Sequence, residues 1–282
     1  MRLFACPLML LALIALAVAP AAGLVTYQAR SEITVLGAAK PQVAVTRCWL
    51  ASDRLRVESP TDLLIVRADR GVVWLADRKA GRYREFAIAA LQQSLSRGQG
   101  EAKPVVPAPG VVALGKRQVN SQELAGHALS IAIPAQGPDK QQVPVTWQLE
   151  LWVAAAPAEA ANAYNALNAR LAASQLPLLT LRAALVAADP QAHPVLLSYA
   201  RATSALSGQL ASILGLPMAM TVSGEVLTPG MERLTPEQRK LVAAEGGATS
   251  LLLVKSENTG LRIVPDDPSV FELPRGYKKA AD

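Results

Sequence analysis

Apolar and polar positions alternate with period two along residues 49–86, and turn residues interrupt them at regular intervals. The breaks fall at 59–62, 69–71 and 77–81, where Ser, Pro, Asp and Gly gather. Alternation with turn chemistry about every eight to twelve residues is typical of an antiparallel meander. The pattern therefore predicts short antiparallel strands, at 54–58, 63–68, 72–76 and 82–86.

The pattern changes outside this meander. Two strands are expected before it, at 24–36 and 43–51, and a short helix after it, at 87–96. A stretch rich in Pro and Gly follows at 98–110 and is expected to be a loop. The second half reads as strands around two helical stretches rich in Ala and Leu. Its strands are expected at 111–118, 127–133, 143–153 and 218–227, its helices at 158–175, at 194–214 and from Thr235, and a closing hairpin at 248–255 and 261–264.

This order of strands, helices and strands favours an α+β fold. We expect a curled antiparallel β-sheet, a half-barrel, covered on one face by a helical insert at about 157–214. A large curled sheet must cover its apolar face, and the Ala-rich helices are available to do so. Residues 24–282 are expected to form a single domain, in which weakly filled Ala packing can leave a cavity for a guest molecule.

The N-terminus has the pattern of an export signal. Arg2 precedes an apolar run at 8–18, and small residues follow at 19–23. This order is typical of a secretory signal peptide. The run is shorter than the roughly 20 apolar residues that a retained membrane anchor needs. We therefore expect residues 1–23 to be a cleaved signal peptide and the protein to be periplasmic or secreted.

Composition narrows the class of partner. With 51% hydrophobic and 18% charged residues, the chain can bury a substantial core. Its formal net charge of +6 favours encounter with anionic partners such as lipid head groups, with at most peripheral contact with a membrane. Nucleic acid is not expected as a partner, because basic residues are interleaved with acidic ones and no aromatic-rich RNA motif or recognition helix is present.

Few residues could carry catalysis or bind a metal. The two histidines, His127 and His193, lack the closely spaced partner ligands of a zinc site. A nucleophile elbow and a P-loop are both absent. Carboxylates recur along the meander and could pair as acid and base, but neighbouring arginines offer them ion pairs instead. These residues are Asp69, Asp77 and Glu85, with Arg67, Arg78 and Arg84. We expect a non-enzymatic protein with no metal and no cofactor.

Cysteine and tryptophan indicate packing more than chemistry. Once the signal peptide is removed, Cys48 stands alone, so an intramolecular disulfide is excluded and a small buried hydrophobe is the simplest interpretation. The tryptophans lie on predicted strands, where they belong to the sheet core or line an apolar groove of the kind that binds lipids. They are Trp49, Trp74, Trp147 and Trp152.

Several motifs of the chain resemble known families. The meander is similar to that of the bacterial lipoprotein-carrier (LolA/LolB-like) families, and more so to that of DUF4412-type periplasmic proteins. The residues that carry this resemblance are Leu55, Arg56, Val57, Glu58, Pro60, Ile65, Asp69, Gly71, Val73, Trp74 and Asp77. Residues 123–127, the strand 149–154 with Glu150 and Trp152, and the segment 271–277 also resemble the DUF4412-type proteins.

The resemblance implies an apolar groove between sheet and helices that accepts lipoprotein acyl chains. It also implies that an arginine at the position of Arg56 bonds to the lid and helps to control its opening. Alternation along the strand, however, places Arg56 on the face opposite Leu55 and Val57, so a solvated strand arginine remains the alternative. The ligand-binding residues proposed on this basis are Trp49, Leu55, Arg56, Val57, Ile65, Trp74 and Trp152.

Two functions are consistent with these observations. The first is an exported, non-enzymatic protein that binds a hydrophobic ligand, an acyl chain or a lipoprotein-like molecule, in a groove between sheet and helices. The alternative is a structural or interaction module of the cell envelope with no small ligand. Such a module would dock on another envelope protein through exposed strand edges or its basic surface.

Overall fold

The computed structural model describes residues 23–35, 40–97, 110–119, 122–136, 142–188, 194–227 and 248–280. The signal peptide predicted at 1–23 and the helix predicted from Thr235 fall outside these ranges, apart from Gly23. Among the described residues, no helix is both long and apolar enough to cross a membrane.

The strands are β1 (Leu24–Val35), β2 (Gln42–Leu50), β3 (Arg54–Glu58), β4 (Asp62–Arg67), β5 (Val72–Asp77), β6 (Arg82–Ala87), β7 (Val112–Val119), β8 (Gln122–Gln136), β9 (Gln142–Ala154), β10 (Leu216–Leu227), β11 (Ala248–Val264) and β12 (Lys278–Lys279). The helices are α1 (Ile88–Arg97), α2 (Ala158–Ala172), α3 (Leu178–Ala187), α4 (Pro194–Ala205) and α5 (Ser207–Ser212), with a 3₁₀ helix at Pro268–Phe271.

All of these strands belong to one sheet, in the order β12-β6-β5-β4-β3-β2-β1-β11-β10-β9-β8-β7. The meander β1–β6 forms one half, and β7–β10 form the other. The long strand β11 joins the halves because it pairs with both β1 and β10. The first strand, β1, and the late strand β11 therefore lie side by side near the centre of the sheet.

The expected fold class, an α+β half-barrel of antiparallel strands, is wrong. The chain forms one large mixed sheet of twelve strands that does not close into a barrel. The sheet is mixed because the chain after β11 returns along its outside, so that β12 pairs with β6 in parallel. The helical layer is also not made by the insert alone. Ile88 and Leu91 of α1, which precedes the insert, are buried in the same core as α2 and α3.

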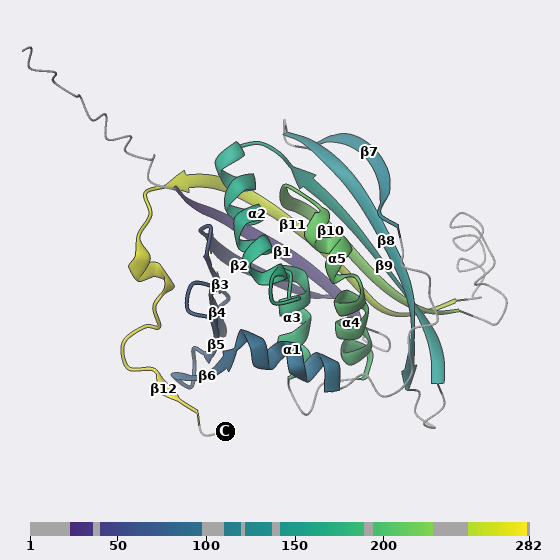
Figure 1. The fold of residues 1–282 in the computed structure, drawn as a ribbon, viewed down its shortest axis with the longest axis horizontal. Helices are drawn as coiled ribbons and strands as arrows, with labels where there is room; N and C mark the ends of the chain where they lie inside the picture. The colour runs from purple at the N-terminus through teal and green to yellow at the C-terminus, as the bar shows by residue number, and fades with distance from the viewer. Residues whose placement is uncertain are drawn as a thin grey trace, which may run out of the picture.

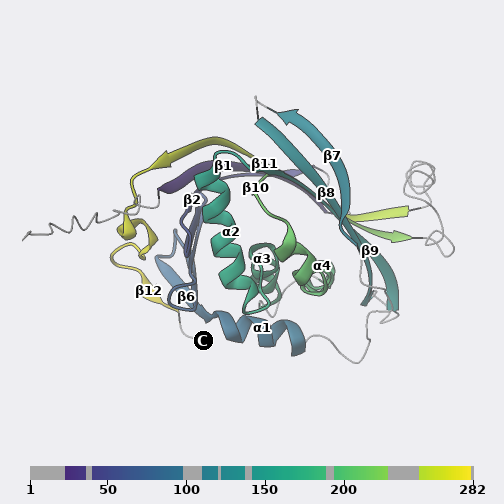
Figure 2. The ribbon, with the colours of Figure 1, turned by 45° about the horizontal axis from the view of Figure 1, so that its top comes forward.

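The sheet bends around α2–α5, and α1 lies across the open side (Figures 1 and 2). We call the face toward the helices the inner face and the opposite one the outer face. Residues 265–280, which we call the C-terminal strap, run along the outer face beside β3–β6 (Figure 2). The sheet thus has a helical cover on one face and a partial, non-helical cover on the other.

Period-two alternation assigns each meander side chain to one of these faces. Leu50, Leu55, Val66 and Val73 are fully buried in the core that includes the helices. Their neighbours in the sequence point the other way and pack against Phe271 of the strap. These outer-face residues include Leu63, Ile65, Trp74 and Ala76. The meander is apolar on both faces because both faces are covered.

The closing hairpin expected at 248–264 is a single 17-residue strand, β11. Gly260, which falls between the two expected strands of that hairpin, lies within β11 and has a φ of 65°. The register of β1 against β11 shifts between Thr26 and Gln28, opposite this glycine. A glycine with positive φ beside an unpaired residue is typical of a β-bulge. The chain bends there and does not reverse.

Candidate functional site

A cleft lies between the inner face of the sheet and helices α2 and α3, and we call it the inner cleft. Its floor comes from the central strands β1, β10 and β11, and its walls come from the two helices. The residues that line it are Tyr27, Ala29, Tyr164, Leu178, Leu179, Arg182, Pro217, Met218, Ala219, Met220, Ser256 and Asn258. Most of these side chains are apolar, and the two methionines supply an adaptable surface.

The inner cleft is narrow in this structure. Its volume is about 50 Å³, room for a few water molecules and far less than the ~300 Å³ of a small ligand pocket. A smaller hollow of about 10 Å³ continues it toward α5. Tyr164, Leu179 and Pro217 line both spaces. The two spaces together mark a continuous line along which the helices are incompletely packed against the sheet.

Helix α3 supplies one wall of the cleft because of its unusual composition. It is apolar nearly all round, with Leu181 and Ala184 fully buried, as expected of a helix inside a core. Its first backbone N–H, on Leu178, donates to Asn168 Oδ1 of α2 at 3.0 Å. Leu179 and Arg182 lie three residues apart and so share one side of the helix. That side faces the cleft.

Buried hydroxyl and thiol groups lie beside the cleft. Tyr27 is buried and lies directly opposite Cys48 of the neighbouring strand β2. Burial raises the pKa of Tyr27 well above its ordinary value and raises the pKa of Tyr164 to about 12. Both phenols are therefore neutral near pH 7, where they can donate hydrogen bonds but cannot serve as bases.

Cys48 is expected to be unreactive in the folded protein. Its side chain is 1% exposed, and burial raises the pKa of the thiol. Only the thiolate is a good nucleophile. In the mature chain we expect labelling by a thiol reagent near pH 7 to be at least about a hundredfold slower than in urea, since it requires opening of the structure. Equal rates with and without urea would contradict this placement of Cys48.

The residues predicted to bind a ligand do not line the inner cleft, and they divide between the two faces. Leu55 and Val57 belong to the inner core, on β3, away from the cleft floor. Ile65, Trp74 and Trp49 belong to the outer-face cluster under the strap. The sequence analysis grouped these residues as one site. Alternation set only Arg56 apart from Leu55 and Val57, and it could not tell which face the helices cover.

Arg56 lies on the outer face. Its guanidinium pairs with Glu58 at 3.0 Å and lies over the Trp49 ring, 5.5 Å from the ring centroid. Its Nη1 donates to the carbonyl oxygen of Val270 in the strap at 2.9 Å. Arg56 is thus neither an arginine that faces the helices and bonds to a helical lid nor a freely solvated strand arginine. It fastens the strap.

Trp152 also faces outward, from the other half of the sheet. Gly126 lies directly opposite it on β8, and a Cβ on Gly126 would come within 2.7 Å of the indole ring. The ring therefore lies over the glycine, and Arg117 of β7 covers it at 4.0 Å. Trp147, by contrast, faces the helices and donates from Nε1 to Ser198 Oγ at 3.0 Å. Trp152 packs the outer face, while Trp147 ties β9 to α4.

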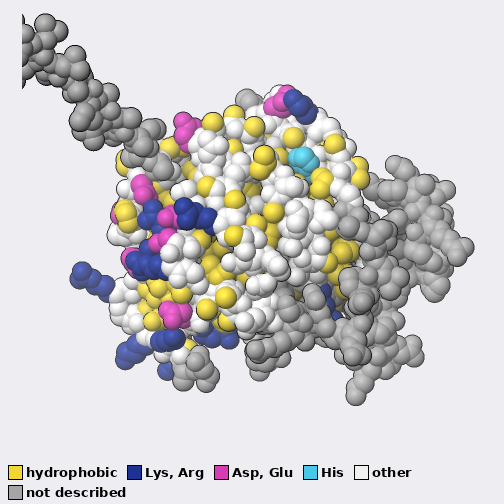
Figure 3. All heavy atoms as spheres, viewed as in Figure 1, with side chains coloured by type: hydrophobic (Ala, Val, Ile, Leu, Met, Phe, Trp, Pro, Cys, Tyr) yellow, Lys and Arg dark blue, Asp and Glu magenta, His cyan; other side chains and the backbone are white. Residues whose placement is uncertain are grey.

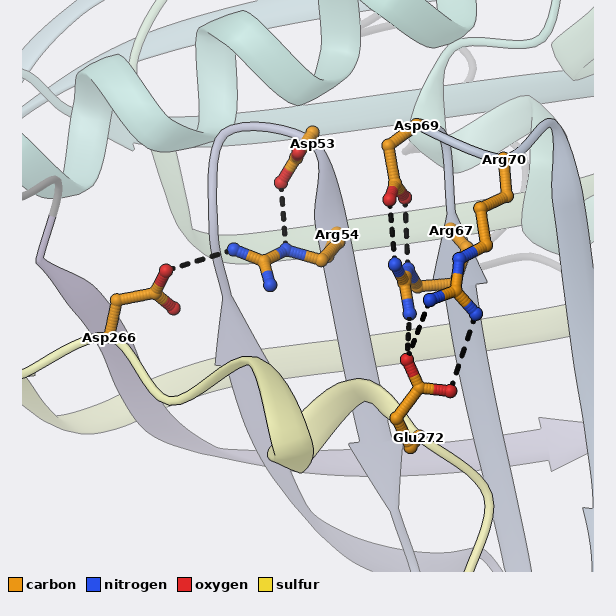
Figure 4. Close-up of polar contacts among 7 residues, drawn as sticks. All are labelled: Asp53, Arg54, Arg67, Asp69, Arg70, Asp266 and Glu272. Carbon is orange, nitrogen blue, oxygen red and sulfur yellow. Dashed lines mark hydrogen bonds and ion pairs between the residues drawn. The ribbon is translucent and has the colours of Figure 1, made fainter.

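Ion pairs hold the strap to the meander (Figure 4). Arg67 is 6% exposed and binds Asp69 with two hydrogen bonds, of 2.9 and 2.7 Å. The same guanidinium and that of Arg70 both pair with Glu272 of the strap. Nearby, Arg54 bridges Asp53 and Asp266, at 2.9 Å each. These carboxylates are engaged in structural pairs and do not form an acid–base site.

The same pairing predicts a dependence of stability on pH. Hydrogen bonds from Arg67 hold the pKa of Asp69 below its ordinary value. Such a carboxyl stabilises the fold above its unfolded pKa of ~3.9 and loses that contribution as the pH falls through its folded pKa. In urea titrations we expect Asp69→Asn to be less stable than the wild type from about pH 7 to about pH 5, and the gap to shrink below about pH 4. A gap that stays constant down to about pH 2 would contradict the pairing.

The remaining candidates for chemistry also have structural roles. Glu85 accepts from Trp74 Nε1 at 2.8 Å, and Asp77 accepts from two backbone N–H groups of the next turn. His127 lies on β8, and His193 lies outside the described residues. Across the described ranges, no group of three or more His, Cys, Asp or Glu side chains could hold a metal ion.

Sequence reasoning missed the residues that line the inner cleft. Tyr27 alternates with Val25 and Ala29, which indicated a shared face, but nothing indicated that β11 would pair with β1 and place Ser256 and Asn258 beside them. Arg182 is the single charged residue of α3. A lone arginine in a helix that is otherwise apolar was the one local signal available.

Comparison with known proteins gives little further guidance. No family model matches the chain, so the DUF4412 resemblance stays a prediction, and no curated protein matches it. A solved putative outer membrane lipoprotein-sorting protein domain from Vibrio parahaemolyticus aligns over 89% of each chain with 7% identity and a TM-score of 0.29. A DUF1329 family protein from Desulfovibrio piger aligns over 88% of this chain and 89% of its own, with 8% identity and a TM-score of 0.28. Function must therefore be inferred from the geometry of this chain.

Proposed function

We propose that this protein is a non-enzymatic, exported binding protein that takes an alkyl chain into the inner cleft, between the sheet and helices α2 and α3. The observation that carries the proposal is the cleft itself. It is a line of incomplete packing between two apolar layers, lined by Ala29, Leu179, Met218 and Met220. An apolar chain is the ligand that such walls can take without leaving buried polar groups unpaired.

The cleft must widen to admit a chain, and the energies allow this. Each buried methylene group contributes about 0.8 kcal/mol, so about ten of them contribute about 8 kcal/mol. That gain can offset a separation of helices and sheet that costs a few kcal/mol. Helices α2 and α3 can shift as a cover because, among the described residues, few hydrogen bonds tie them to the sheet. One such bond, at 2.9 Å, is donated by the N–H of Gly215, directly before β10, to Asn165 Oδ1 of α2.

Binding of an apolar dye and its displacement test the proposal. The mature protein should enhance the fluorescence of a dye such as N-phenylnaphthylamine, and laurate or lauryl alcohol should displace the dye. Native mass spectrometry of the same sample should show one bound alkyl chain per protein molecule. A protein that neither enhances the dye nor retains a chain in the mass spectrometer would overturn the proposal.

The alternative, an interaction module, has one specific observation in its favour. Strand β2 extends beyond its partner β3, whose pairing ends at Arg47 opposite Glu58. On the unpaired part of β2, Val43 is 54% and Val45 50% exposed. An apolar strand edge of this kind can accept a strand from another protein. Protein that carries no lipid but binds a defined envelope protein through β2 would favour this function.

A further inference from the structure

Arg182 places a positive charge at the rim of the inner cleft. It is exposed, and it lines the cleft together with Leu179, one helical turn away on α3. It also lies close enough to the buried hydroxyls of Tyr27 and Tyr164 to influence both electrostatically. The guanidinium thus stands where the apolar walls meet solvent.

This charge has no acidic partner within the part of the chain that the structure describes. The ion pairs found there gather on the outer face and on β7–β8, and none includes Arg182. Helices α2–α5 contain three arginines but one carboxylate, Glu159. In the view onto the helices, most charged side chains lie at the left and lower edges, with a further pair at the top, and few lie over the middle of the face (Figure 3). An anion at the cleft would therefore meet an unpaired cation and little repulsion.

We propose that the ligand of the inner cleft is an anionic single-chain amphiphile, whose acidic oxygen atoms pair with Arg182 while its chain lies between Leu179, Met218 and Met220. This inference rests on the proposed function. Arginine suits the role because its planar guanidinium binds a carboxylate or a phosphate through two parallel hydrogen bonds. At the rim the pair is partly shielded from water by the apolar walls, which strengthens it relative to a fully solvated pair.

The polar residues of the cleft floor agree with an end-on arrangement. Ser256 and Asn258 line the cleft on β11, but both are already engaged in hydrogen bonds. Ser256 accepts one from Ser31 at 3.0 Å, and Asn258 donates one to the carbonyl oxygen of Pro217 at 2.6 Å. Arg182 is therefore the group best placed to select the head of the ligand, and the rest of the cleft selects for its chain.

The test compares chains that share a length and differ in their head group. Laurate, lauryl phosphate, lauryl alcohol and inorganic phosphate are titrated against the wild type, Arg182→Met and Arg170→Met. Arg170→Met is the matched control, because it removes the same charge from an exposed site on α2 outside the cleft. We expect the wild type and the control to bind laurate or lauryl phosphate about ten- to a hundredfold more tightly than the alcohol. Arg182→Met should abolish this preference without lowering the affinity for lauryl alcohol.

The outcomes separate the two proposals. If lauryl alcohol binds the wild type as tightly as laurate and lauryl phosphate do, the role of Arg182 is refuted. The same holds if Arg182→Met still prefers the anions to the alcohol. In both cases the proposal that the inner cleft binds an alkyl chain is unaffected. If none of the three chains binds, the proposed function itself fails. Binding of inorganic phosphate as tight as that of lauryl phosphate would mean a free-anion site and would also refute the inference. A preference for laurate over lauryl phosphate assigns a fatty carboxylate, and the reverse assigns a phosphate head group.

Discussion

Phe271→Ala is expected to lower the free energy of unfolding by about 3–5 kcal/mol. Phe271 is fully buried on the outer face, where it packs with Leu63, Ile65 and Trp74, and the Arg54 guanidinium lies 4.8 Å from its ring centroid. Its removal leaves a cavity beneath the strap that the sheet cannot fill by relaxing. Because domains are typically stable by only 5–15 kcal/mol, the loss is a large share of the total. Urea titration followed by tryptophan fluorescence measures it.

Two further variants keep this prediction testable if Phe271→Ala does not fold. Phe271→Leu retains most of the apolar volume and is expected to cost about 1–1.5 kcal/mol. Arg275→Ala, at an exposed strap position, should change the stability by no more than about 0.5 kcal/mol. If Phe271→Leu is no more destabilising than Arg275→Ala, the strap does not contribute to the core.

Met220→Trp is expected to lower the affinity for an alkyl chain by at least about a hundredfold. Met220 lines the inner cleft from β10, and a tryptophan there would fill a space of about 50 Å³. A chain displaced by only four methylene groups loses about 3 kcal/mol, which is more than a hundredfold in affinity. Titration with laurate measures the loss, and thermal unfolding verifies that the variant is folded.

The matched control for this variant is the next residue along the same strand. Thr221 pairs with Glu150 and Lys255 and points to the outer face. Thr221→Trp therefore adds the same bulk without entering the cleft, and we expect its affinity for laurate to stay within about threefold of the wild type. Equal affinities of Met220→Trp and Thr221→Trp would place the chain somewhere other than the inner cleft.

The sequence was most informative where structure is local. The meander at 54–87 follows from alternation and from turns such as Ser59–Asp62, where the backbone N–H groups of Thr61 and Asp62 donate to Ser59 Oγ. Such contacts join residues a few positions apart, so their pattern is visible in a short window. The strands β3–β6 accordingly lie within a residue or so of the predicted ranges.

The sequence was least informative where distant segments meet. Nothing in residues 24–35 indicates pairing with 248–264. The hairpin expected at 248–264 is one bulged strand, and a bulge and a turn both use a glycine with positive φ. The outer cover was missed for a related reason. The meander carries buried apolar side chains on both of its faces. Only the structure shows that the strap covers one of these faces. The inner cleft depends on both features, so its residues could not be assembled from the sequence.

Photo-crosslinking tests most directly whether the chain lies between the helices and the sheet. A fatty acid with a diazirine near its methyl end is bound to the mature protein and irradiated, and the modified peptides are identified by mass spectrometry. The account predicts adducts on the cleft-lining segments, around Tyr164, Leu179 and Met218–Met220, and their loss in Met220→Trp. Adducts confined to the outer face, around Trp152 or β7, would contradict it.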